Sequence, residues 1–333
     1  MLQNASGPIL NKSPGRKTKN RVLLFGGSGL LGSELHILLK REGHDLWAPS
    51  SGEVDCREEA QVLSALRHGR PDVVVMAAAK VGGILANMKR GSEFLRDNVR
   101  MNFSVLNVCA GLGVSRVLVF GSSCMYPKDI NRPLVTEDLL TAPVEPTSEL
   151  YALSKILTTK YAQALRREGK CCATVCVPNN LYGDGDRFSA EEGHLISSLI
   201  VKMHQAKLDH QPRLELWGDG TPRRDFLHAE DAARACLAVL ETENPPEIVH
   251  FGTGQEFTIR QIAEKVAQAV GFSGEIVFTG LVSNGASRKW LAVDWLFQQG
   301  WRPRVSMEEG IRRAYQAYLS QQAVGISIAG EVR

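Results

Sequence analysis

Residues 117–128, VLVFGSSCMYPK, place two hydroxyls, a thiol and a phenol directly after a strongly apolar run. These polar groups belong to Ser122, Ser123, Cys124 and Tyr126. Hydroxyls and thiols at the end of a strand can hydrogen-bond a substrate and move its protons. From these residues alone, the segment is either one wall of a catalytic site or the polar end of a buried strand.

A second candidate site is the glycine-rich stretch LLFGGSGLLGSEL, which has glycines at positions 26, 29 and 32. It follows a strand-like run and opens a helical pattern. In that context the first glycine turns the chain, the second lets the backbone approach a pyrophosphate, and the third allows close packing of helix on strand. The pyrophosphate then rests on the helix N-terminus. The pattern predicts a dinucleotide cofactor; the alternative is a glycine-rich turn without a ligand.

The type of dinucleotide depends on the end of the second strand, where an acidic residue would bind the ribose 2′-hydroxyl of NAD. This chain has Ala48, Pro49, Ser50 and Ser51 there, with no carboxylate at the tip and no arginine to hold a 2′-phosphate. The hydroxyls of Ser50 and Ser51 can bond a 2′-phosphate. We therefore expect NADP(H), with NAD(H) as the open alternative.

A tyrosine and a lysine stand four residues apart in YALSK, as Tyr151 and Lys155. The surrounding pattern is helical, so both side chains project from one face. A phenol is a poor acid at neutral pH unless a cation stabilises its anion, and we expect Lys155 to lower the pKa of Tyr151 by about 2 to 3 units. The alternative is a chance pair on an amphipathic helix. The order of glycine loop, GSS and Tyr-x-x-x-Lys is typical of a dehydrogenase sheet.

The elements that must position these residues alternate between strand and helix. Apolar, β-branched runs predict strands within 21–27, 44–49, 72–80, 114–123 and 170–183, and amphipathic segments predict helices at 30–43, 58–71, 94–113 and 148–169. Such alternation predicts an α/β fold, a Rossmann-like doubly wound parallel sheet. After residue 183 we expect a helix at 193–207, a strand at 213–218, a helix and a strand that rejoin the sheet at 224–242 and 247–254, and a further helix at 258–271.

These elements predict a division into domains. Residues 21–183, with 218–253 returning, form the dinucleotide-binding domain, and residues 184–217 and 254–320 form a smaller substrate-binding region. Residues 1–20 are polar and contain Gly and Pro, which predicts a disordered tail, and residues 321–333 are expected to be a flexible tail.

Composition excludes several classes of protein. The 333 residues include 39 basic and 36 acidic ones, a net charge of +3 that does not indicate nucleic-acid binding. The chain has neither a signal-peptide pattern nor an apolar run long enough to span a membrane, so we expect a cytoplasmic protein. Seven cysteines, an odd number, favour reduced thiols. Cys171, Cys172 and Cys176 lack the C-x-x-C spacing of a metal site, and we predict no metal.

Seven motifs occur in an order that resembles one family. They are AAAKVGGI (77–84), GSSCMYPK (121–128), EPTSELYALSK (145–155), NLYG (180–183), GHLISSLI (193–200), WGDGTPRRDFLHAED (217–231) and RKWLAVD (288–294). Over about residues 21–303 the chain is similar to the bifunctional nucleotide-sugar 3,5-epimerase/4-reductases of the extended short-chain dehydrogenase/reductase family. The resemblance implies NADP(H)-dependent 3,5-epimerisation and 4-keto reduction of a GDP-4-keto-6-deoxy-hexose, giving GDP-L-fucose or a close relative. It also implies a homodimer formed through helices that include residues 92–112 and 148–168.

The same resemblance implies roles for individual residues. Ser122 would hydrogen-bond the sugar O4, Tyr151 would protonate it, Lys155 would bond the nicotinamide ribose, and Cys124 and His194 would move protons at C3 and C5. The cofactor-binding residues would be Gly26, Gly27, Ser28, Gly29, Leu30, Leu31, Gly32, Ser50, Ala78, Ala79, Tyr151, Lys155, Pro178, Asn180, Leu181 and His194. The substrate-binding residues would be Ser123, Asn180, Lys202, Trp217, Arg224 and Lys289.

The sequence departs from the family pattern at four places. Pro49 to Ser51 replace the arginines that would hold a 2′-phosphate. Ser28 stands where members often carry a basic residue, and Lys202 stands where an arginine usually meets the diphosphate. The segment DGDRFSAEEGH (184–194) replaces the usual Pro-x-Asp-Asn-Phe before the histidine. An alternative is therefore a reductase or epimerase of another nucleotide sugar, such as a GDP-heptose or another deoxyhexose. A non-catalytic dinucleotide-binding regulator is a third reading, against which the intact Tyr151 and Lys155 argue.

Overall fold

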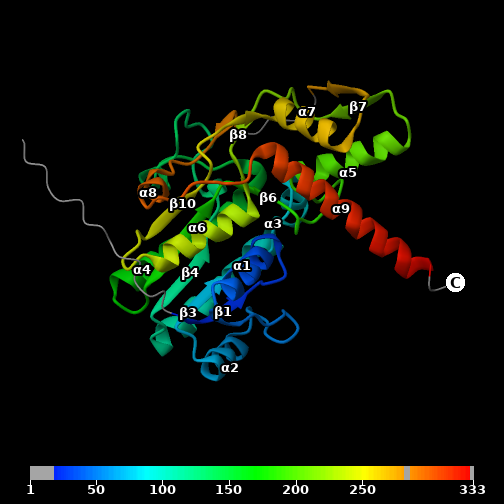
Figure 1. Cartoon of the computed structure of the whole chain (residues 1–333). Helices are drawn as coiled ribbons and strands as arrows, with labels where there is room; N and C mark the ends of the chain where they lie inside the picture. The colour runs from blue at the N-terminus through cyan, green and yellow to red at the C-terminus, as the bar shows by residue number, and fades with distance from the viewer. Residues whose placement is uncertain (1–18, 281–285, 331–333) are drawn as a thin grey trace, which may run out of the picture.

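A six-stranded parallel sheet forms the centre of the computed structural model, which describes residues 19–280 and 286–330, with side chains up to Ala323 (Figure 1). Its order is β10-β5-β4-β3-β1-β2, and every neighbouring pair is parallel. The strands are β1 (Arg21–Phe25), β2 (Asp45–Trp47), β3 (Val73–Met76), β4 (Arg116–Phe120), β5 (Ala173–Pro178) and β10 (Ile248–Phe251). The predicted α/β, doubly wound parallel sheet is confirmed.

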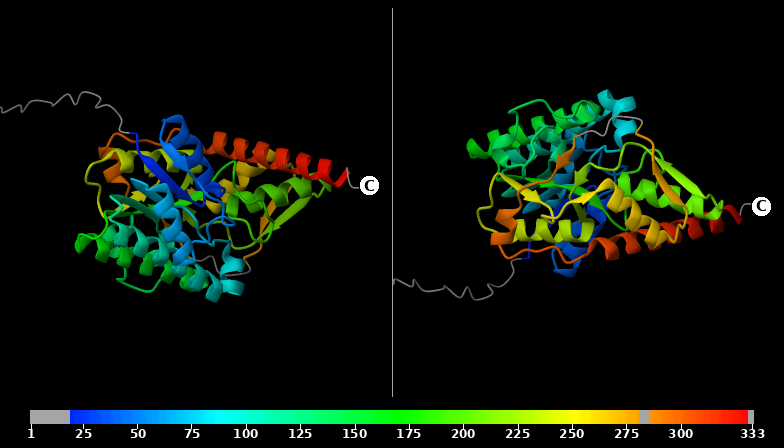
Figure 2. Two further views of the ribbon diagram at one scale, coloured as in Figure 1. Left: turned by 90° about the horizontal axis from the view of Figure 1, so that it is seen from below. Right: turned by 90° about the horizontal axis from the view of Figure 1, so that it is seen from above.

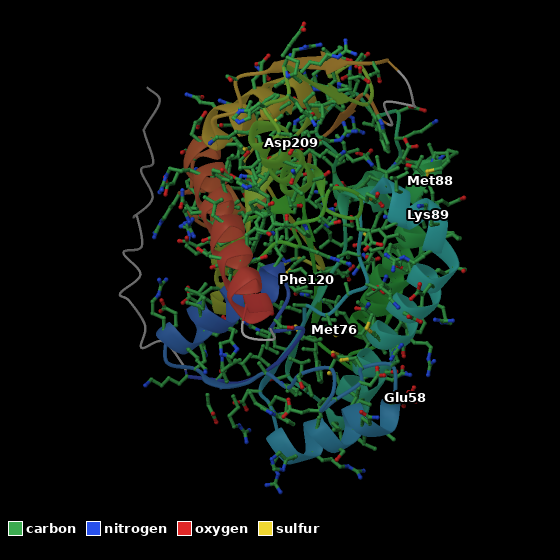
Figure 3. The ribbon with its side chains drawn as sticks, turned by 90° about the vertical axis from the view of Figure 1, so that its right-hand side faces the viewer. Glu58, Met76, Met88, Lys89, Phe120 and Asp209 are labelled. Atoms are coloured by element: carbon green, nitrogen blue, oxygen red, sulfur yellow. The ribbon has the colours of Figure 1, made fainter. Side chains whose placement is uncertain are left out.

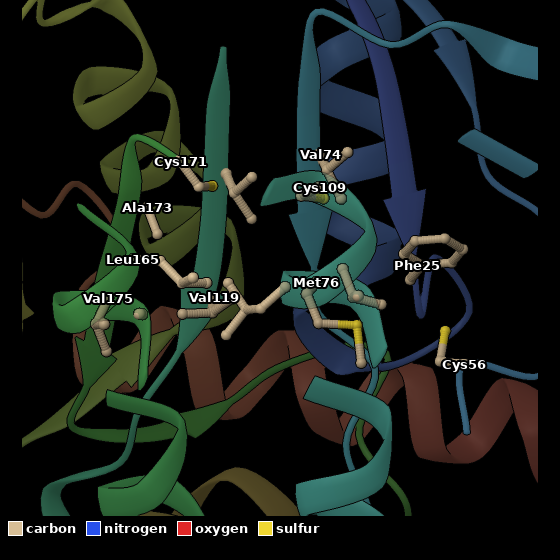
Figure 4. Close-up of a cluster of buried hydrophobic side chains, with 14 of the residues drawn as sticks. Phe25, Cys56, Val74, Met76, Cys109, Val119, Leu165, Cys171, Ala173 and Val175 are labelled. Carbon is tan, nitrogen blue, oxygen red and sulfur yellow. The ribbon is translucent and has the colours of Figure 1, made fainter. Parts of the chain in front are cut away.

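Helices cover both faces of this sheet (Figures 1 and 2). They are α1 (Leu30–Arg41) and α6 (Ala229–Glu241) on one face, and α2 (Glu59–Gly69), α3 (Ile84–Leu112) and α4 (Glu149–Arg167) on the other. Successive strand residues point to opposite faces, so Leu23 and Phe25 pack toward α2–α4 while Val22 and Leu24 pack toward α1 and α6. Figure 4 shows part of the first of these two cores. Burial on both faces explains the nearly continuous apolar runs of the strands.

A second, smaller cluster of helices has its own core. It contains α5 (Leu195–Leu208), α7 (Ile259–Val270) and α9 (Met307–Gly330), beside the parallel pair β7 (Arg213–Leu216) and β12 (Glu275–Phe278). The start of α7 is fixed by a capping box, in which the Thr258 hydroxyl accepts from the Gln261 amide at 3.1 Å and the Gln261 side chain accepts from the Thr258 amide at 2.8 Å.

Short strands connect the two parts. β6 (Asn180–Tyr182) pairs with β9 (Phe226–His228), and β8 (Arg223–Arg224) lies between β11 (Phe257–Thr258) and β13 (Arg288–Lys289). The remaining elements are α8 (Asp294–Gln298) and the 3₁₀ turns η1 (Ser123–Met125), η2 (Thr136–Asp138) and η3 (Pro146–Ser148). No helix among the described residues is long and apolar enough to cross a membrane.

Three predicted boundaries differ from the structure. The helix predicted at 94–113 begins at Ile84 and is kinked at Arg90. At the next residue, Gly91, the helix lies so close to α4 that an added Cβ would lie 2.9 Å from a Leu150 methyl carbon. The helix predicted from residue 224 begins at Ala229, because 223–228 supply β8 and β9. Residues 321–330 of the predicted C-terminal tail belong to the last helix, α9, which ends at Gly330. Residues 1–18 of the predicted N-terminal tail lie outside the described residues, and the domain division stays a prediction.

A buried polar chain joins the segment after β4 to the segment after β13. The Tyr126 hydroxyl lies 2.6 Å from His250 Nε2, and His250 Nδ1 lies 3.0 Å from the Ala292 carbonyl. A carbonyl can only accept, so Nδ1 carries the proton and Tyr126 donates to Nε2. Burial lowers the pKa of His250 to about 4, which keeps the ring neutral and this pattern intact at neutral pH.

The Tyr126–His250 bond can be tested by a substitution that removes one oxygen. Tyr126→Phe leaves His250 Nε2 buried without a donor, so we expect a loss of about 1 to 3 kcal/mol in the free energy of unfolding, measured with urea. Tyr161→Phe is the control, because the Tyr161 hydroxyl bonds Asn107 near the surface. Equal losses in both variants would contradict a special contribution from the buried pair.

Candidate active site

The glycine loop between β1 and α1 has the shape that a dinucleotide requires. Gly26 has φ +83°, and an added Cβ there would lie 2.4 Å from the Ala78 amide nitrogen. An added Cβ at Gly32 would lie 1.9 Å from the Gly26 carbonyl oxygen. Ser28 and Gly29 are exposed, and Gly29 caps α1 without a side-chain hydrogen bond. The first amides of α1 are therefore available to an anion, and these residues fit a pyrophosphate.

The other predicted cofactor residues surround the same edge of the sheet. Ala78 and Ala79 follow β3, Pro178 ends β5, and Asn180 and Leu181 belong to β6. The carboxyl ends of parallel strands at a switch in strand order are where ligands bind in such sheets. Figure 3 labels Met76 and Phe120, the last residues of β3 and β4, near the middle of the molecule. Among the loop residues, Leu31 is buried in the core, so only its backbone can face a cofactor.

The tip of β2 differs from the prediction. The chain turns back after Ser50, and the Glu53 carboxylate accepts from both the amide and the hydroxyl of Ser50 at 2.8 Å. These two bonds hold the pKa of Glu53 below its ordinary value. A carboxylate therefore does stand at this tip, and the Ser50 hydroxyl is already engaged. Sequence reasoning missed it because Glu53 lies beyond the strand and reaches back through a turn.

Tyr151 and Lys155 lie together on α4, but the predicted effect on the pKa of the tyrosine is wrong. Burial raises the pKa of Tyr151 above its ordinary value, the charge of Cys124 adds to this, and a hydrogen bond with Ser122 opposes it. Lys155 Nζ lies 5.8 Å from the Tyr151 ring centre and donates to the Phe120 carbonyl at 2.9 Å. Burial lowers the pKa of Lys155 to about 8. The lysine is thus a weakened cation above the ring, and Tyr151 is protonated.

The segment after β4 brings Ser122 and Cys124 next to this pair. Ser122 caps the turn η1, with its hydroxyl accepting from the Cys124 amide at 3.2 Å. The Cys124 side chain is half-buried, whereas Ser123 is only 5% exposed and lies inside the fold. A hollow of about 510 Å³ between α3 and the start of α4 is lined by Tyr151, Leu150 and Met88, among others. Figure 3 shows Met88 on the outer side of α3.

The predicted substrate residues form two basic groups. Arg224 on β8 is the register partner of Lys289 on β13, and the Cys124 charge acts on Arg224, whose pKa burial lowers. In the second group, Lys202 Nζ lies 5.5 Å from the centre of the Trp217 ring, which is 56% exposed, and burial lowers the pKa of Lys202. The side-chain amide nitrogen of Asn180 donates to the Asp225 backbone carbonyl at 2.8 Å, so this donor is already engaged within the fold.

Residues 184–194 form a loop that three other elements hold. Asp184 pairs with Arg313 of α9 at 3.1 Å. Gly185 faces α1, where an added Cβ would lie 3.0 Å from the Ser33 hydroxyl oxygen. At the other end Glu192 pairs with Arg90 of α3 at 3.2 Å, and its carbonyl accepts from the Gly83 amide at 3.1 Å. This 184–194 loop therefore extends from α1, which follows the glycine loop, to the start of α3.

His194 is the last residue of the 184–194 loop and the N-cap of α5. Its side chain is exposed and makes no capping bond. Within the described residues it has no hydrogen bond or ion pair with Cys124 or Tyr151. Sequence reasoning missed the partners that hold this loop, because Arg313 and Gly83 lie about a hundred residues away and no local pattern marks them.

The cysteine run in β5 belongs to the core. Cys171 and Cys176 are buried, and burial raises the pKa of Cys171 to about 11. Within the described ranges, no group of three or more His, Cys, Asp or Glu side chains is arranged to hold a metal ion.

Comparisons with known proteins show which family this chain belongs to. Residues 22–252 match the NAD dependent epimerase/dehydratase family. The chain is 37% identical over 303 residues to the GDP-L-fucose synthase of Sinorhizobium fredii, covering 91% of this chain and 96% of that enzyme. It is 32% identical over 304 residues to the GDP-L-colitose synthase of Yersinia pseudotuberculosis, covering 91% and 99%. A structure of a GDP-L-fucose synthetase from Naegleria fowleri bound to NADP has a TM-score of 0.83 at 27% identity, covering 91% and 93%.

The weakened cation at Lys155 predicts a pH-dependent stability. Its pKa of about 8 in the folded protein lies below the ordinary lysine value of 10.5, so between these pH values the unfolded chain binds a proton that the folded chain has lost. Stability from this group therefore rises as pH increases through 8. Lys155→Met lacks this contribution, so its stability relative to wild type should fall by about 2 kcal/mol from about pH 7.5 to 9.5, measured by urea unfolding. A constant difference would show that Lys155 does not titrate in this range.

The carboxylate at the tip of β2 predicts an effect on cofactor affinity. Glu53→Gln keeps an acceptor for Ser50 but removes a negative charge near the expected place of a 2′-phosphate, so NADPH should bind about fivefold more tightly while NADH changes little. Fluorescence titration of both nucleotides measures this. Glu58→Gln, which removes another exposed carboxylate in the same part of the chain, is the matched control. An equal gain for both nucleotides would contradict the assignment.

Proposed function

Because the chain belongs to the NAD dependent epimerase/dehydratase family, we propose that it is an NADP(H)-dependent enzyme acting on a GDP-sugar. The reaction is inversion at C3 and C5 and reduction at C4 of a GDP-4-keto-6-deoxy-hexose, giving GDP-L-fucose or a close relative. The observation that carries this proposal is the cluster of Ser122, Cys124, Tyr151 and Lys155 beside Arg224 at the carboxyl edge of the sheet. It unites an acid for a ketone oxygen with a thiol for the neighbouring carbons.

The reductive half needs one hydride and one proton. NADPH held at the glycine loop of residues 26–32 would supply the hydride to C4. Tyr151 supplies the proton to O4, and its raised pKa keeps it protonated until the oxygen gains charge. Ser122, which hydrogen-bonds Tyr151, is placed to donate to the same oxygen. Lys155 above the ring favours the phenolate that remains.

The epimerising half uses the acidity that the ketone gives to its neighbouring C–H bonds. Each inversion removes a proton from one face of C3 or C5 and returns a proton to the other face, so no net proton is consumed. Cys124 and His194 are the proposed pair for these transfers. Thiols and imidazoles have ordinary pKa values of about 8.5 and about 6.5, within reach of neutral pH.

The nucleotide half of the substrate is anionic, and two separate basic groups suit it. Arg224 and Lys289 lie side by side, and Lys202 lies under the exposed Trp217. We assign the diphosphate to these cations and contact with a sugar or base to the aromatic ring. Lysine at position 202 keeps the charge but lacks the bidentate fork of an arginine.

A cytoplasmic homodimer is part of the proposal. Helices α3 and α4 pack against each other, and Leu112 and Leu157 on them are exposed, as are Met88 and Leu150. Exposed apolar side chains on two adjacent helices suit an isologous contact with a second copy.

A second candidate function is the synthesis of a different GDP-deoxysugar. A relative named GDP-L-colitose synthase matches 91% of the chain, and Lys202 and the 184–194 loop depart from the family pattern. Asp184, however, is used by its ion pair with Arg313, so this particular departure has a role in the fold.

Incubation with GDP-4-keto-6-deoxy-mannose in deuterated water, with NADPH or NADH, tests the proposal. Mass spectrometry should find deuterium at C3 and C5 and reduction at C4, faster with NADPH. Cys124→Ser should slow exchange at C3 by at least about a hundredfold while reduction of a pre-epimerised ketone survives. Tyr151→Phe is the converse control and should lose the reduction. Loss of hydride transfer with normal exchange in Cys124→Ser would refute the role of the thiol.

A further inference from the structure

Asp186 in the 184–194 loop is a buried carboxylate with an oxygen to spare. It is 6% exposed. Its Oδ1 accepts from the Arg187 amide at 2.8 Å, whereas its Oδ2 is buried without a hydrogen-bond partner among the described residues. Burial of an unpaired carboxylate oxygen is unfavourable, and such groups are usually paired. The spare oxygen therefore points to a partner that another state of the enzyme supplies.

The groups that face Asp186 identify this partner. Burial raises the pKa of Asp186, and the His194 imidazole, the Arg187 amide and the Ser197 hydroxyl oppose that rise, His194 most strongly. The backbone of His194 is fixed, since its carbonyl accepts from the Ser197 hydroxyl at 3.0 Å and the Ser198 amide at 2.8 Å. Its ring is exposed and makes no capping bond. The exposed imidazole of His194 thus has the buried carboxylate of Asp186 as an electrostatic neighbour.

The other carboxylates of the 184–194 loop face different cations. Asp184 pairs with Arg313, and Glu192 pairs with Arg90 and Arg187. The charge of Glu191 acts on Lys202. Asp186, in contrast, has no cation of this kind within the part of the chain that the structure describes, and the nearby charge that acts on it is that of His194.

We propose that Asp186 is the positioning residue for His194 in proton transfer. Its free oxygen holds the imidazole in one orientation and stabilises the imidazolium while the ring carries a proton taken from, or destined for, the sugar carbon. A carboxylate behind a histidine serves general acid–base catalysis in this way without itself accepting the proton. This inference rests on the role of His194 in the proposed function.

The test separates proton exchange from hydride transfer. Asp186→Asn keeps an acceptor for the Arg187 amide but removes the charge. We expect kcat for deuterium exchange at the carbon served by His194 to fall about tenfold or more, with KM unchanged. Reduction of the pre-epimerised ketone should stay within about twofold of wild type. Because the variant removes a poorly paired buried charge, Tm should stay the same or rise.

Three companion variants keep the result decisive. Asp184→Asn changes a carboxylate two residues away that pairs with α9, and it should retain exchange. Asp186→Glu restores the charge and should recover part of the lost exchange. His194→Gln locates the carbon whose exchange depends on the imidazole.

Each outcome decides between the alternatives. If Asp186→Asn loses exchange and reduction equally, with a lower Tm, the carboxylate only supports the loop and the inference fails. If His194→Gln loses exchange while Asp186→Asn keeps it, the inference fails and the proposed function stands. If His194→Gln itself keeps exchange at both carbons, the role proposed for His194 is wrong and the role of Asp186 falls with it.

Discussion

All six strands of the central sheet run parallel, so their carboxyl ends meet at one edge, and the candidate chemistry depends on that constraint. The glycine loop follows β1, Ala78 follows β3, Ser122 and Cys124 follow β4, and Pro178 ends β5. Residues spread over a hundred positions are neighbours for this reason alone. The hydrogen bond from Lys155 to the Phe120 carbonyl fixes α4 against the same edge and completes the group.

Low polarity at this edge sets the protonation of the site. Tyr151 and Lys155 are each pushed toward their neutral forms, the tyrosine by retaining its proton and the lysine by losing it more readily. A neutral phenol under a weakened cation is suited to donate when negative charge develops on a ketone oxygen. Asp186 belongs to the same pattern, since burial also favours its neutral form until an opposite charge approaches. Burial, rather than strong ion pairs, thus sets the protonation of these three groups.

Sequence patterns predicted the sheet and its helices because most of its strands are apolar on both faces and its helices on one. The glycine loop was predicted correctly because its glycine spacing directly follows a strand and opens a helix, although the contact that requires a glycine at position 26 is with the distant Ala78. The errors lie where a turn or a contact with a distant segment, rather than a repeating pattern, determines the structure. The turn that brings Glu53 back to Ser50, the kink at Arg90 and the clamp of Arg313 on Asp184 arise from folded geometry that no local periodicity encodes. The pKa of Tyr151 was misjudged for a related reason, because spacing reveals a neighbouring lysine but not the burial of both groups.

The distribution of thiols has a consequence for chemical labelling. All seven cysteines are unpaired, and five are buried, whereas Cys124 and Cys172 are partly exposed. Burial raises the pKa of Cys56 to about 12 and that of Cys109 and Cys236 well above their ordinary values, which suppresses the thiolate that an alkylating reagent attacks. A small electrophile therefore meets only two competing sites on the folded chain. The native protein carries its own attachment point for a spectroscopic reporter beside the candidate acid, with one distant thiol to remove first.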